Sequence, residues 1–511
     1  MRLSITVALA ISLTVLLGVT AIDIPPQSVP TRIVSTKGPL FVDELGRSRI
    51  FRGTNVVYKG APWHPDISPD ALPRWSFNQD DIDILASHGV TAIRLGIMWP
   101  GVEPVRGQYN YTYLEVMKTI VQRCSNAGIY VLLDFHQDGL SEKFCGEGVP
   151  LWAAQPAQSP LNLLGFPVPI EARPYKLQEN GVPTPEDCAK HYYDKLQFTY
   201  AAGTAYQRLY DNHDGLRDSF ANYWKLVAQT FFPFKNILGY DLINEPWAGN
   251  VVSNPGLLVP GIADRMNLQG FYDVIATAIR SVDPNAMIFF ESVTWDNFVV
   301  GFDHAPGGTQ YASKSVLSFH HYQPPQLFNL NATFVERSLD MLRLQSGGML
   351  TEFEMGWKKG ENIEYIRDVS RLADKFFFSY TGWEYTDYIP ITGTNNGLRD
   401  PETGLVRPDM AEVYSRTYAT AIAGIPLSMS SEDKTGLFTL TFFSDGTSNP
   451  TEIRVNSPRH YPSGYSVAVQ STSAAFRVLQ PNEGAKDGFI HVVREQAGRA
   501  GAKVTVTVSR A

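Results

Sequence analysis

Two glutamates in this sequence stand where a short buried strand would end. Glu245 follows the apolar segment 237–243 and Asn244, and Glu352 lies near the end of the apolar segment 348–353. Short apolar segments bounded by turn-forming residues or proline are typical of buried strands. An isolated Asn-Glu-Pro tripeptide would be weak evidence for a catalytic site. Two strand-end glutamates about 100 residues apart indicate a pair.

Two carboxylates that flank a glycosidic bond can cleave it. One protonates the departing oxygen, while the other attacks the anomeric carbon or activates a water molecule. We assign Glu245 as the acid and later the base, and Glu352 as the nucleophile. Retention of configuration requires a carboxyl separation of about 5 to 5.5 Å, whereas a separation of about 9 Å would indicate inversion.

Other polar and aromatic residues at expected strand ends have physical roles beside such a pair. Arg94 can bind a carboxylate and keep it ionised, and Tyr322 can hydrogen-bond the nucleophile. Asn244 can donate to the 2-hydroxyl of a sugar, and Trp383 can stack on a sugar face. Each has a plainer interpretation: Arg94 as a structural ion-pair partner, Trp383 as a core residue, and His136 as a satisfied polar group.

A metal centre is the alternative that the histidines and aspartates suggest. The candidate ligands are Asp134, His136, Asp138, His320 and His321. Adjacent residues of a strand point to opposite faces, so His320 and His321 are not expected to bind one ion together. We therefore predict neither a metal nor another cofactor.

The elements that must position these residues alternate between strands and helices. Eight strands are expected at 52–55, 90–95, 129–135, 237–243, 287–291, 316–320, 349–353 and 377–383. Seven helices are expected at 77–88, 111–126, 216–232, 262–282, 333–344, 362–375 and 409–423. This alternation implies parallel strands and crossover helices, and eight units predict an α/β fold, the closed (β/α)8 TIM barrel. An open doubly wound sheet is disfavoured, because no Gly-x-Gly-x-x-Gly follows an early strand.

The chain divides into two expected domains after a leader. Residues 38–425 form the catalytic barrel, interrupted by an irregular insertion at about 139–215 that is rich in proline and glycine. Residues 427–511 form a β-sandwich domain of short alternating strands. Those strands are expected at 436–443, 451–455, 465–470, 475–479, 488–493 and 503–508.

The N-terminus and the cysteines indicate export. A charge, an apolar run and small residues within 1–21 describe a signal peptide, so we expect a secreted protein in the extracellular space or in a digestive or lysosomal lumen. Asn110 and Asn331 lie in glycosylation sequons. We expect a disulfide between Cys145 and Cys188, which share the insertion, and a buried free thiol at Cys124.

Charge argues against one class of partner. The 511 residues carry a formal net charge of -8 and no long basic run, which disfavours a nucleic-acid binder. We expect a monomer.

Taken together, these residues resemble glycoside hydrolase family 5, a family of the retaining clan with (β/α)8 barrels. The matching residues, in the family's order, are Arg94, His136, Asn244-Glu245-Pro246, His320-x-Tyr322, Glu352 and Trp383. Within that family the fuller strings resemble endoglycoceramidases. Those strings are residues 133–138, 244–249, 319–322 and 350–353.

The resemblance implies hydrolysis, with retention, of the bond between oligosaccharide and ceramide in glycosphingolipids of a membrane or micelle. It also implies sugar-binding roles for Lys59, Asp134 and Asp138. The apolar segments 161–170 and 251–262 support a lipid aglycone, with folding back onto the barrel as the alternative. One departure is Glu354, two residues after Glu352, which strand alternation would place on the same face.

Three other functions stay open. A polysaccharide endoglucanase of the same family would have aromatic residues on both sides of the glutamates. A β-glucosidase on glucosylceramide or steryl glucosides would release single sugars. A glycolipid-binding lectin without catalysis is disfavoured by the presence of both glutamates and their polar neighbours.

Overall fold

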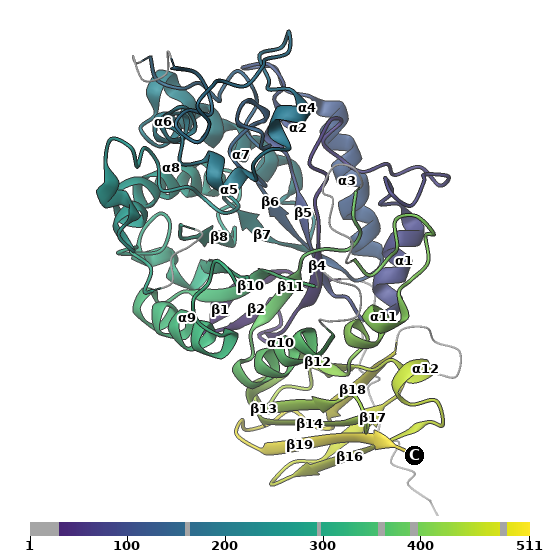
Figure 1. Cartoon of the computed structure of the whole chain (residues 1–511). Coiled ribbons are helices and arrows are strands. Elements are labelled where there is room, and N and C mark those ends of the chain that lie inside the picture. Colours follow the sequence, from purple (N-terminus) through teal and green to yellow (C-terminus); the bar gives the residue numbers. More distant parts are fainter. Residues whose placement is uncertain (1–29, 159–163, 294–297, 356–362, 389–396, 481–487) are drawn as a thin grey trace, which may run out of the picture.

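A computed structural model gives the structure of the chain (Figure 1). It describes residues 30–158, 164–293, 298–355, 363–388, 397–480 and 488–511. The expected signal peptide at 1–21 and part of the apolar segment 161–170 lie outside the described residues. Among the described helices, none has the length and apolar character needed to cross a membrane.

Eight parallel strands close into a barrel, which confirms the predicted fold class (Figure 1). The barrel order is β10-β11-β4-β5-β6-β7-β8-β9, so that each strand pairs with its neighbours in sequence and the first pairs with the last. The strands are β4 (Arg52–Val56), β5 (Ala92–Gly96), β6 (Tyr130–Asp134), β7 (Ile237–Asp241), β8 (Ile288–Glu291), β9 (Ser315–His321), β10 (Gly347–Phe353) and β11 (Ser379–Gly382).

Helices cover the outside of the barrel, and their ends follow local chemistry. Asn78 accepts hydrogen bonds from the amides of Asp80 and Asp81 at the start of α1, while the Asp81 carboxylate accepts from the Asn78 amide. The helices are α1 (Gln79–Ser87), α2 (Trp99–Val102), α3 (Tyr111–Asn126), α4 (Pro185–Cys188), α5 (Tyr193–Leu196), α6 (Tyr200–Tyr210), α7 (Leu216–Phe231), α8 (Gln269–Arg280), α9 (Leu330–Leu344), α10 (Ile363–Phe376), α11 (Pro408–Tyr414) and α12 (Ser457–His460).

Two parts of the helix prediction were wrong. The helix expected at 409–423 ends at Tyr414, and Tyr418–Ile422 forms strand β12 instead. The backbone groups of Tyr418–Ile422 pair with β3 and β15, and Tyr418, Thr420 and Ile422 are residue types that favour strands, so the sheet competes successfully with the helix. Conversely, α6 forms inside the insertion, where no helix was expected.

The connection from β8 to β9 departs from the strand-helix alternation. Within the described part of that connection there is no α-helix, only the 3-10 turn Thr309–Lys314. A close backbone approach between Gly261 and Gly301 packs this irregular segment against the start of the α8 region, since a Cβ on Gly301 would lie 1.8 Å from the Gly261 carbonyl oxygen.

Two antiparallel sheets form the C-terminal sandwich. One has the order β1-β2-β3-β12-β15-β18-β17 and the other β13-β14-β19-β16, and apolar residues of both sheets share one core. The strands are β1 (Ile33–Lys37), β2 (Leu40–Asp43), β3 (Ser48–Arg49), β13 (Gly424–Glu432), β14 (Leu437–Ser444), β15 (Thr451–Arg454), β16 (Tyr465–Ser471), β17 (Phe476–Leu479), β18 (Phe489–Arg494) and β19 (Lys503–Arg510). The first sheet therefore takes strands from both ends of the chain.

The hairpin of β1 and β2 also fills the end of the barrel where the strands begin. Phe41 is fully buried; its ring lies 5.4 Å from Phe51 of the barrel wall and 6.0 Å from Phe289 of β8, between centroids. Ile33 belongs to the same apolar cluster. The barrel floor is thus closed by residues that precede its first strand.

Removing the Phe41 side chain is expected to destabilise the whole barrel. Phe41→Ala leaves a cavity among buried aromatic rings and should lower the free energy of unfolding by about 3–5 kcal/mol, measured by denaturant titration. Leu45→Ala in the turn after β2, where Leu45 is half exposed, is the matched control and should have little effect. Equal effects of the two substitutions would contradict the structural role of Phe41.

Candidate active site

The two predicted glutamates face each other across the end of the barrel where the strands finish. One carboxylate oxygen of Glu245 and one of Glu352 lie within 4.8 Å of each other, and both lie within this distance of a ring nitrogen of His320. Oxygens this close fit a retaining pair, whose carboxyl groups lie about 5 to 5.5 Å apart, better than an inverting pair, whose carboxyl groups lie about 6.5 to 9.5 Å apart. The spacing therefore supports direct attack by one carboxylate.

The backbone of Glu245 is held in an unusual conformation. Its φ angle is 40°, in the left-handed region that non-glycine residues rarely adopt. Its amide donates to Oε2 of Glu291 at 2.9 Å, and its carbonyl accepts from Nε2 of Gln137 at 2.9 Å. Tyr206 in turn donates to Oε1 of Gln137 at 2.7 Å. These bonds fix the turn that aims the Glu245 carboxylate into the site.

Glu352 is buried and receives hydrogen bonds on both oxygens. Arg94 Nη1 donates to Oε1 at 2.7 Å, and the Tyr322 hydroxyl donates to Oε2 at 2.8 Å. Both contacts were predicted from the sequence and are present. Burial raises the pKa of Glu352 above its usual value, although the Arg94 guanidinium opposes this increase.

Arg94 is the central cation of the site and has no exposed side-chain surface. It pairs with Asp134 at 2.8 Å and with Asp241 at 2.8 Å, as well as with Glu352. It also donates to Oδ1 of Asn244 at 2.9 Å. One guanidinium thus orients residues from several strands, a geometry that its planar fork of five donors suits.

Glu245 has a different environment. His320 Nδ1 lies 2.9 Å from its Oε1, and the hydroxyl of Tyr193 donates weakly to Oε2 at 3.4 Å. Burial raises the pKa of Glu245 to about 7, with a further increase from Asp138, while Lys59 and Arg94 lower it. Burial also lowers the pKa of His320 to about 4, so this histidine is neutral near pH 7. A carboxyl group with this pKa can carry a proton at neutral pH.

The two adjacent histidines point in opposite directions, as expected from strand alternation. His320 faces the glutamates, whereas His321 Nδ1 contacts the hydroxyl of Thr333 on α9 at 3.2 Å. Close oxygen and nitrogen atoms also occur at His136, Asp138 and Glu147. Those two carboxylates are in contact with the ammonium group of Lys59, which supplies the positive charge there.

The remaining predicted residues lie on one side of the pair. Asp134 accepts from His136 Nδ1 at 2.8 Å, and the His136 ring stacks on the Trp383 indole with centroids 5.1 Å apart. The Lys59 ammonium lies 4.5 Å from the centre of the same indole, and it contacts Asp138. Lysine, carboxylate and indole groups in this arrangement suit a polyhydroxylated ligand.

The sequence matches known proteins over both domains. Residues 51–388 match the cellulase family, glycoside hydrolase family 5, and residues 416–508 match the C-terminal domain of the same family. The chain belongs to glycoside hydrolase family 5. This confirms the family resemblance inferred from the motifs.

Within family 5 the similar proteins include endoglycoceramidases. The chain is 43% identical to an endoglycoceramidase of Hydra vulgaris over 84% of this chain and 82% of that protein. It is 42% identical to the endoglycoceramidase of Cyanea nozakii over 84% and 85% of the two chains. The solved structure of endo-glycoceramidase II from Rhodococcus sp. has the same fold, with a TM-score of 0.71 at 23% identity over 93% of this chain and 100% of that chain.

Several residues of this family 5 site were not assigned roles from the sequence. Glu291 stands at an expected strand end, which was a usable signal, but its bond to the Glu245 amide is a tertiary contact. Gln137 and Glu147 lie beside predicted residues, and Tyr193 comes from the insertion. Only the folded chain brings these residues to the glutamates.

Glu354 lies just past the end of β10, where it forms an isolated parallel bridge with Trp383. The like charge with the largest effect on the pKa of Glu352 is Glu245, and Glu354 instead raises the pKa of Tyr365 on α10, after the larger effect of burial.

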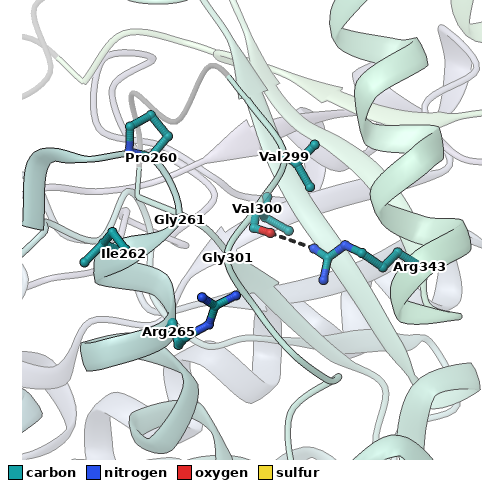
Figure 2. Close-up of a pocket in the computed structure, with 8 residues that line it drawn as sticks. All are labelled: Pro260, Gly261, Ile262, Arg265, Val299, Val300, Gly301 and Arg343. Atoms are coloured by element: carbon teal, nitrogen blue, oxygen red, sulfur yellow. Dashed lines mark hydrogen bonds between the residues drawn. The ribbon is translucent and has the colours of Figure 1, made fainter.

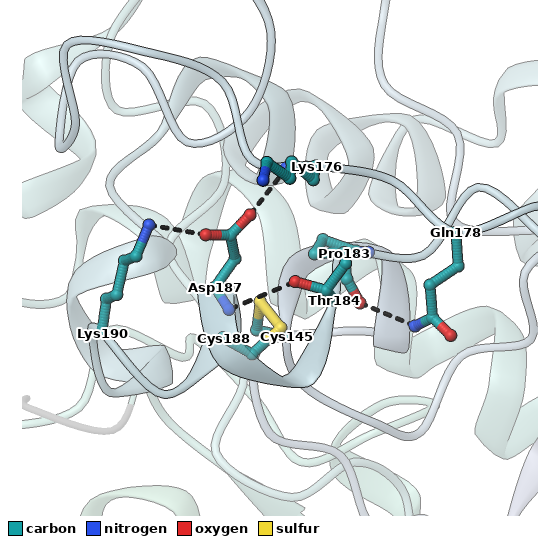
Figure 3. Close-up of a disulfide and its surroundings, with 8 residues drawn as sticks. All are labelled: Cys145, Lys176, Gln178, Pro183, Thr184, Asp187, Cys188 and Lys190. Atoms are coloured by element: carbon teal, nitrogen blue, oxygen red, sulfur yellow. Dashed lines mark hydrogen bonds and ion pairs between the residues drawn. A yellow bond between two sulfur atoms is a disulfide. The ribbon is translucent and has the colours of Figure 1, made fainter.

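A disulfide fixes the insertion that carries Tyr193 (Figure 3). Cys145 and Cys188 are bonded, as predicted, and Cys124 is a buried free thiol, also as predicted. Around the bridge, Asp187 accepts from the Lys176 amide at 2.7 Å. The helix α5 with Tyr193 begins five residues after Cys188, so the bridge limits how far Tyr193 can move from Glu245.

Removing the bridge is expected to loosen the insertion without unfolding this family 5 barrel. The combined change Cys145→Ala and Cys188→Ala frees a loop of 43 residues, which removes about 4 kcal/mol of constraint on the unfolded segment. Chymotrypsin should then cut within 190–200 at least about tenfold faster than in the wild type. Lys195→Ala, which keeps the bridge, is the control, and unchanged cleavage in the cysteine variant would contradict the role of the bridge.

Proposed function

We propose that this protein is a retaining endo-β-glycosidase that hydrolyses the linkage between oligosaccharide and ceramide in glycosphingolipids, releasing intact glycan and ceramide. The observation that carries the proposal is the pair Glu245 and Glu352, whose oxygens lie within 4.8 Å, at the strand ends of a family 5 barrel. Its likeness to the endoglycoceramidases of Hydra vulgaris and Cyanea nozakii supports the substrate class.

Glu352 is the proposed nucleophile. The hydrogen bonds from Arg94 and Tyr322 favour its ionised form and hold both oxygens, so one oxygen is oriented towards the anomeric carbon. Attack forms a bond between this oxygen and the anomeric carbon as the bond to the ceramide oxygen breaks. The product is a glycosyl-enzyme ester and a ceramide oxygen that needs a proton.

Glu245 is the proposed acid and base. Its raised pKa of about 7 leaves it protonated in much of the free enzyme near neutral pH, so it can donate to the leaving ceramide oxygen. Once Glu352 is esterified, its negative charge is gone, and Glu245 is then easier to ionise. The ionised Glu245 takes a proton from the water that hydrolyses the ester.

The other predicted residues bind the sugars beside the cleaved bond in this proposal. Asn244 uses one amide hydrogen on the carbonyl of Gln137 at 3.1 Å, and its second hydrogen can bind a sugar hydroxyl. The remaining proposed sugar-binding residues are Lys59, Arg94, Asp134, His136, Asp138, His320, Tyr322 and Trp383.

The ceramide part of the substrate is proposed to contact the connection that follows β7 and Glu245. In the connection after β7, Val252, Leu258 and Val259 each expose two fifths or more of their surface. Folding back onto the barrel, the alternative considered for this segment, accounts for Val251 and Leu257, which are buried. Exposed aliphatic side chains beside a polar sugar site suit a glycolipid with an apolar tail.

Three further functions are favoured less. A glucosidase on glucosylceramide or steryl glucosides is suggested by weaker likenesses, such as 26% identity to the ergosteryl-beta-glucosidase of Saccharomyces cerevisiae over 54% of this chain. A polysaccharide endoglucanase would use aromatic platforms on both sides of the glutamates, whereas the exposed side chains after β7 are aliphatic. A lectin without catalysis does not explain the hydrogen-bonded pair of glutamates.

We also propose that the protein is secreted, as a monomer and a glycoprotein. The apolar leader at 1–21 and the disulfide support passage through an oxidising compartment. Asn110 is exposed and caps α3 through Oδ1, which accepts from the Tyr113 amide at 3.1 Å. A glycan on Nδ2 would leave this cap intact. Asn331 is also exposed, at the start of α9.

The proposal is tested by the products formed from a ganglioside. Wild-type protein is expected to release the intact oligosaccharide and ceramide, detected by mass spectrometry of the aqueous and organic phases. Glu352→Gln should be slower by at least about 10⁴-fold, because it removes the nucleophile but keeps the shape of the side chain. Release of single terminal sugars would overturn the endoglycosidase assignment, and turnover by neither protein would favour the lectin.

The acid role of Glu245 predicts a specific pH dependence. Glu245 must be protonated to act as the acid. On the alkaline limb of the pH profile, kcat/KM on a ganglioside should therefore be highest at the low-pH end and fall as pH rises through about 7. Glu245→Gln should lack this limb and should still form the glycosyl-enzyme from an aryl glycoside whose phenolate leaves without a proton. An unchanged limb in Glu245→Gln would assign the limb to another group.

A further inference from the structure

The side of the barrel between α8 and α9 has an unusual apolar surface. The connection from β8 to β9 carries only a 3-10 turn in its described part, so it does not cover this side as a full helix would. Several large apolar side chains are exposed here. We call them the flank surface: Val259, Met266, Phe298, Val299, Leu339 and Leu342.

The α9 part of the flank surface is a regular stripe. Val335, Leu339 and Leu342 are spaced by four and three residues, so they lie on one face of the helix. Leu339 is 56% exposed and Leu342 is 75% exposed. The opposite face of α9 is the one that packs on the barrel, with Phe334 and Met341 buried. A second apolar face on such a helix has no role in the barrel core.

A cavity joins the three elements of the flank surface (Figure 2). Its volume is about 320 Å³, and its lining comes from the β7–α8 connection, the β8–β9 connection and α9. The lining residues are Pro260, Gly261, Ile262, Arg265, Val299, Val300, Gly301 and Arg343. Arg343 of α9 donates to the Val300 carbonyl at 2.6 Å, and Figure 2 shows this bond across the cavity. The cavity therefore lies where the three elements that carry the flank surface meet.

The flank surface includes part of the connection that is proposed to contact the ceramide. The connection that leaves Glu245 carries the exposed Leu258 and Val259 and then reaches the cavity at Pro260. Phe298 lies in the β8–β9 connection, and Phe328 lies in the connection that follows β9. Their rings meet edge-on with centroids 6.1 Å apart. Three neighbouring connections at the active end of the barrel thus lead onto the flank.

Charge is consistent with a zwitterionic phospholipid surface as the occupant. Arg265 at the cavity pairs with the exposed Asp303 at 3.3 Å, and Arg343 pairs with Asp340 at 3.4 Å. These charges balance one another, so the exposed apolar side chains are not accompanied by a strong field of one sign that would oppose contact with such a bilayer.

We propose that the flank surface docks on a lipid bilayer and holds the active site over glycolipid that remains embedded there. The inference rests on the proposed function, because the ceramide part of the substrate anchors it in a bilayer. Leu339, Leu342 and Val299 would enter the interfacial region of the bilayer. The connection after β7 would then extend from the bilayer to Glu245.

The test compares one substrate in two physical states. Wild-type protein and the double variant Leu339→Ser, Leu342→Ser are assayed on a ganglioside in phosphatidylcholine vesicles and on the same ganglioside in detergent micelles. The variant should lose at least about tenfold of its rate on vesicles, and it should co-sediment less with them. Its rate on micelles should stay within about twofold, because neither leucine belongs to the catalytic site.

A matched control replaces exposed apolar residues elsewhere. Ile425 and Leu427 of β13 are 52% and 43% exposed, and the double change Ile425→Ser, Leu427→Ser should leave both rates unchanged. Equal rates of wild type and the α9 variant on vesicles would overturn the docking proposal and leave a protein partner as the occupant of the flank. A wild type inactive on both preparations would overturn the proposed function instead, while co-sedimentation would still report on docking.

Discussion

The guanidinium of Arg94 is the interaction on which the active end of the barrel depends. It is fully buried and holds three carboxylates, those of Asp134, Asp241 and Glu352. A buried carboxylate without a partner costs several kcal/mol. The strands β4, β5, β6, β7 and β10 each contribute one residue to this cluster, through Asn55, Arg94, Asp134, Asp241 and Glu352. The positions of these strand ends are therefore coupled through one cation.

The same cation separates the roles of two chemically identical side chains. Glu352 is in direct contact with Arg94, while the closest donors to Glu245 are a neutral histidine, His320, and the phenol of Tyr193. Glu352 is buried and the Glu245 side chain is 13% exposed, but within the described structure only Glu352 has a cation at hydrogen-bonding distance. In the proposed mechanism the proton of the pair is therefore carried by Glu245 in the free enzyme, as an acid catalyst requires.

Features that depend on the local sequence pattern were predicted correctly, whereas features that depend on contacts between residues far apart in the sequence were not. Strand ends could be read from short apolar segments, which brought Glu245, Glu352, Arg94 and Tyr322 together correctly. The hydrogen bonds that fix the backbone of Glu245 could not be predicted from the sequence. The position of Glu291 at a strand end does not reveal that its carboxylate accepts from the Glu245 amide. The segment of β12 was misread as helix because its partners, β3 and β15, lie far away in sequence.

The sheet that joins both ends of the chain has a consequence for how the protein is made. Arg49 of β3 pairs with Ala421 of β12, and β12 pairs in turn with β15. During synthesis β3 therefore cannot form its hydrogen bonds to β12 until the whole barrel between them has been made, and a contact of such long range slows folding. Because the hairpin of β1 and β2 also closes the barrel floor, the barrel and the sandwich are completed together. A single cut in the sequence cannot separate them into two intact domains.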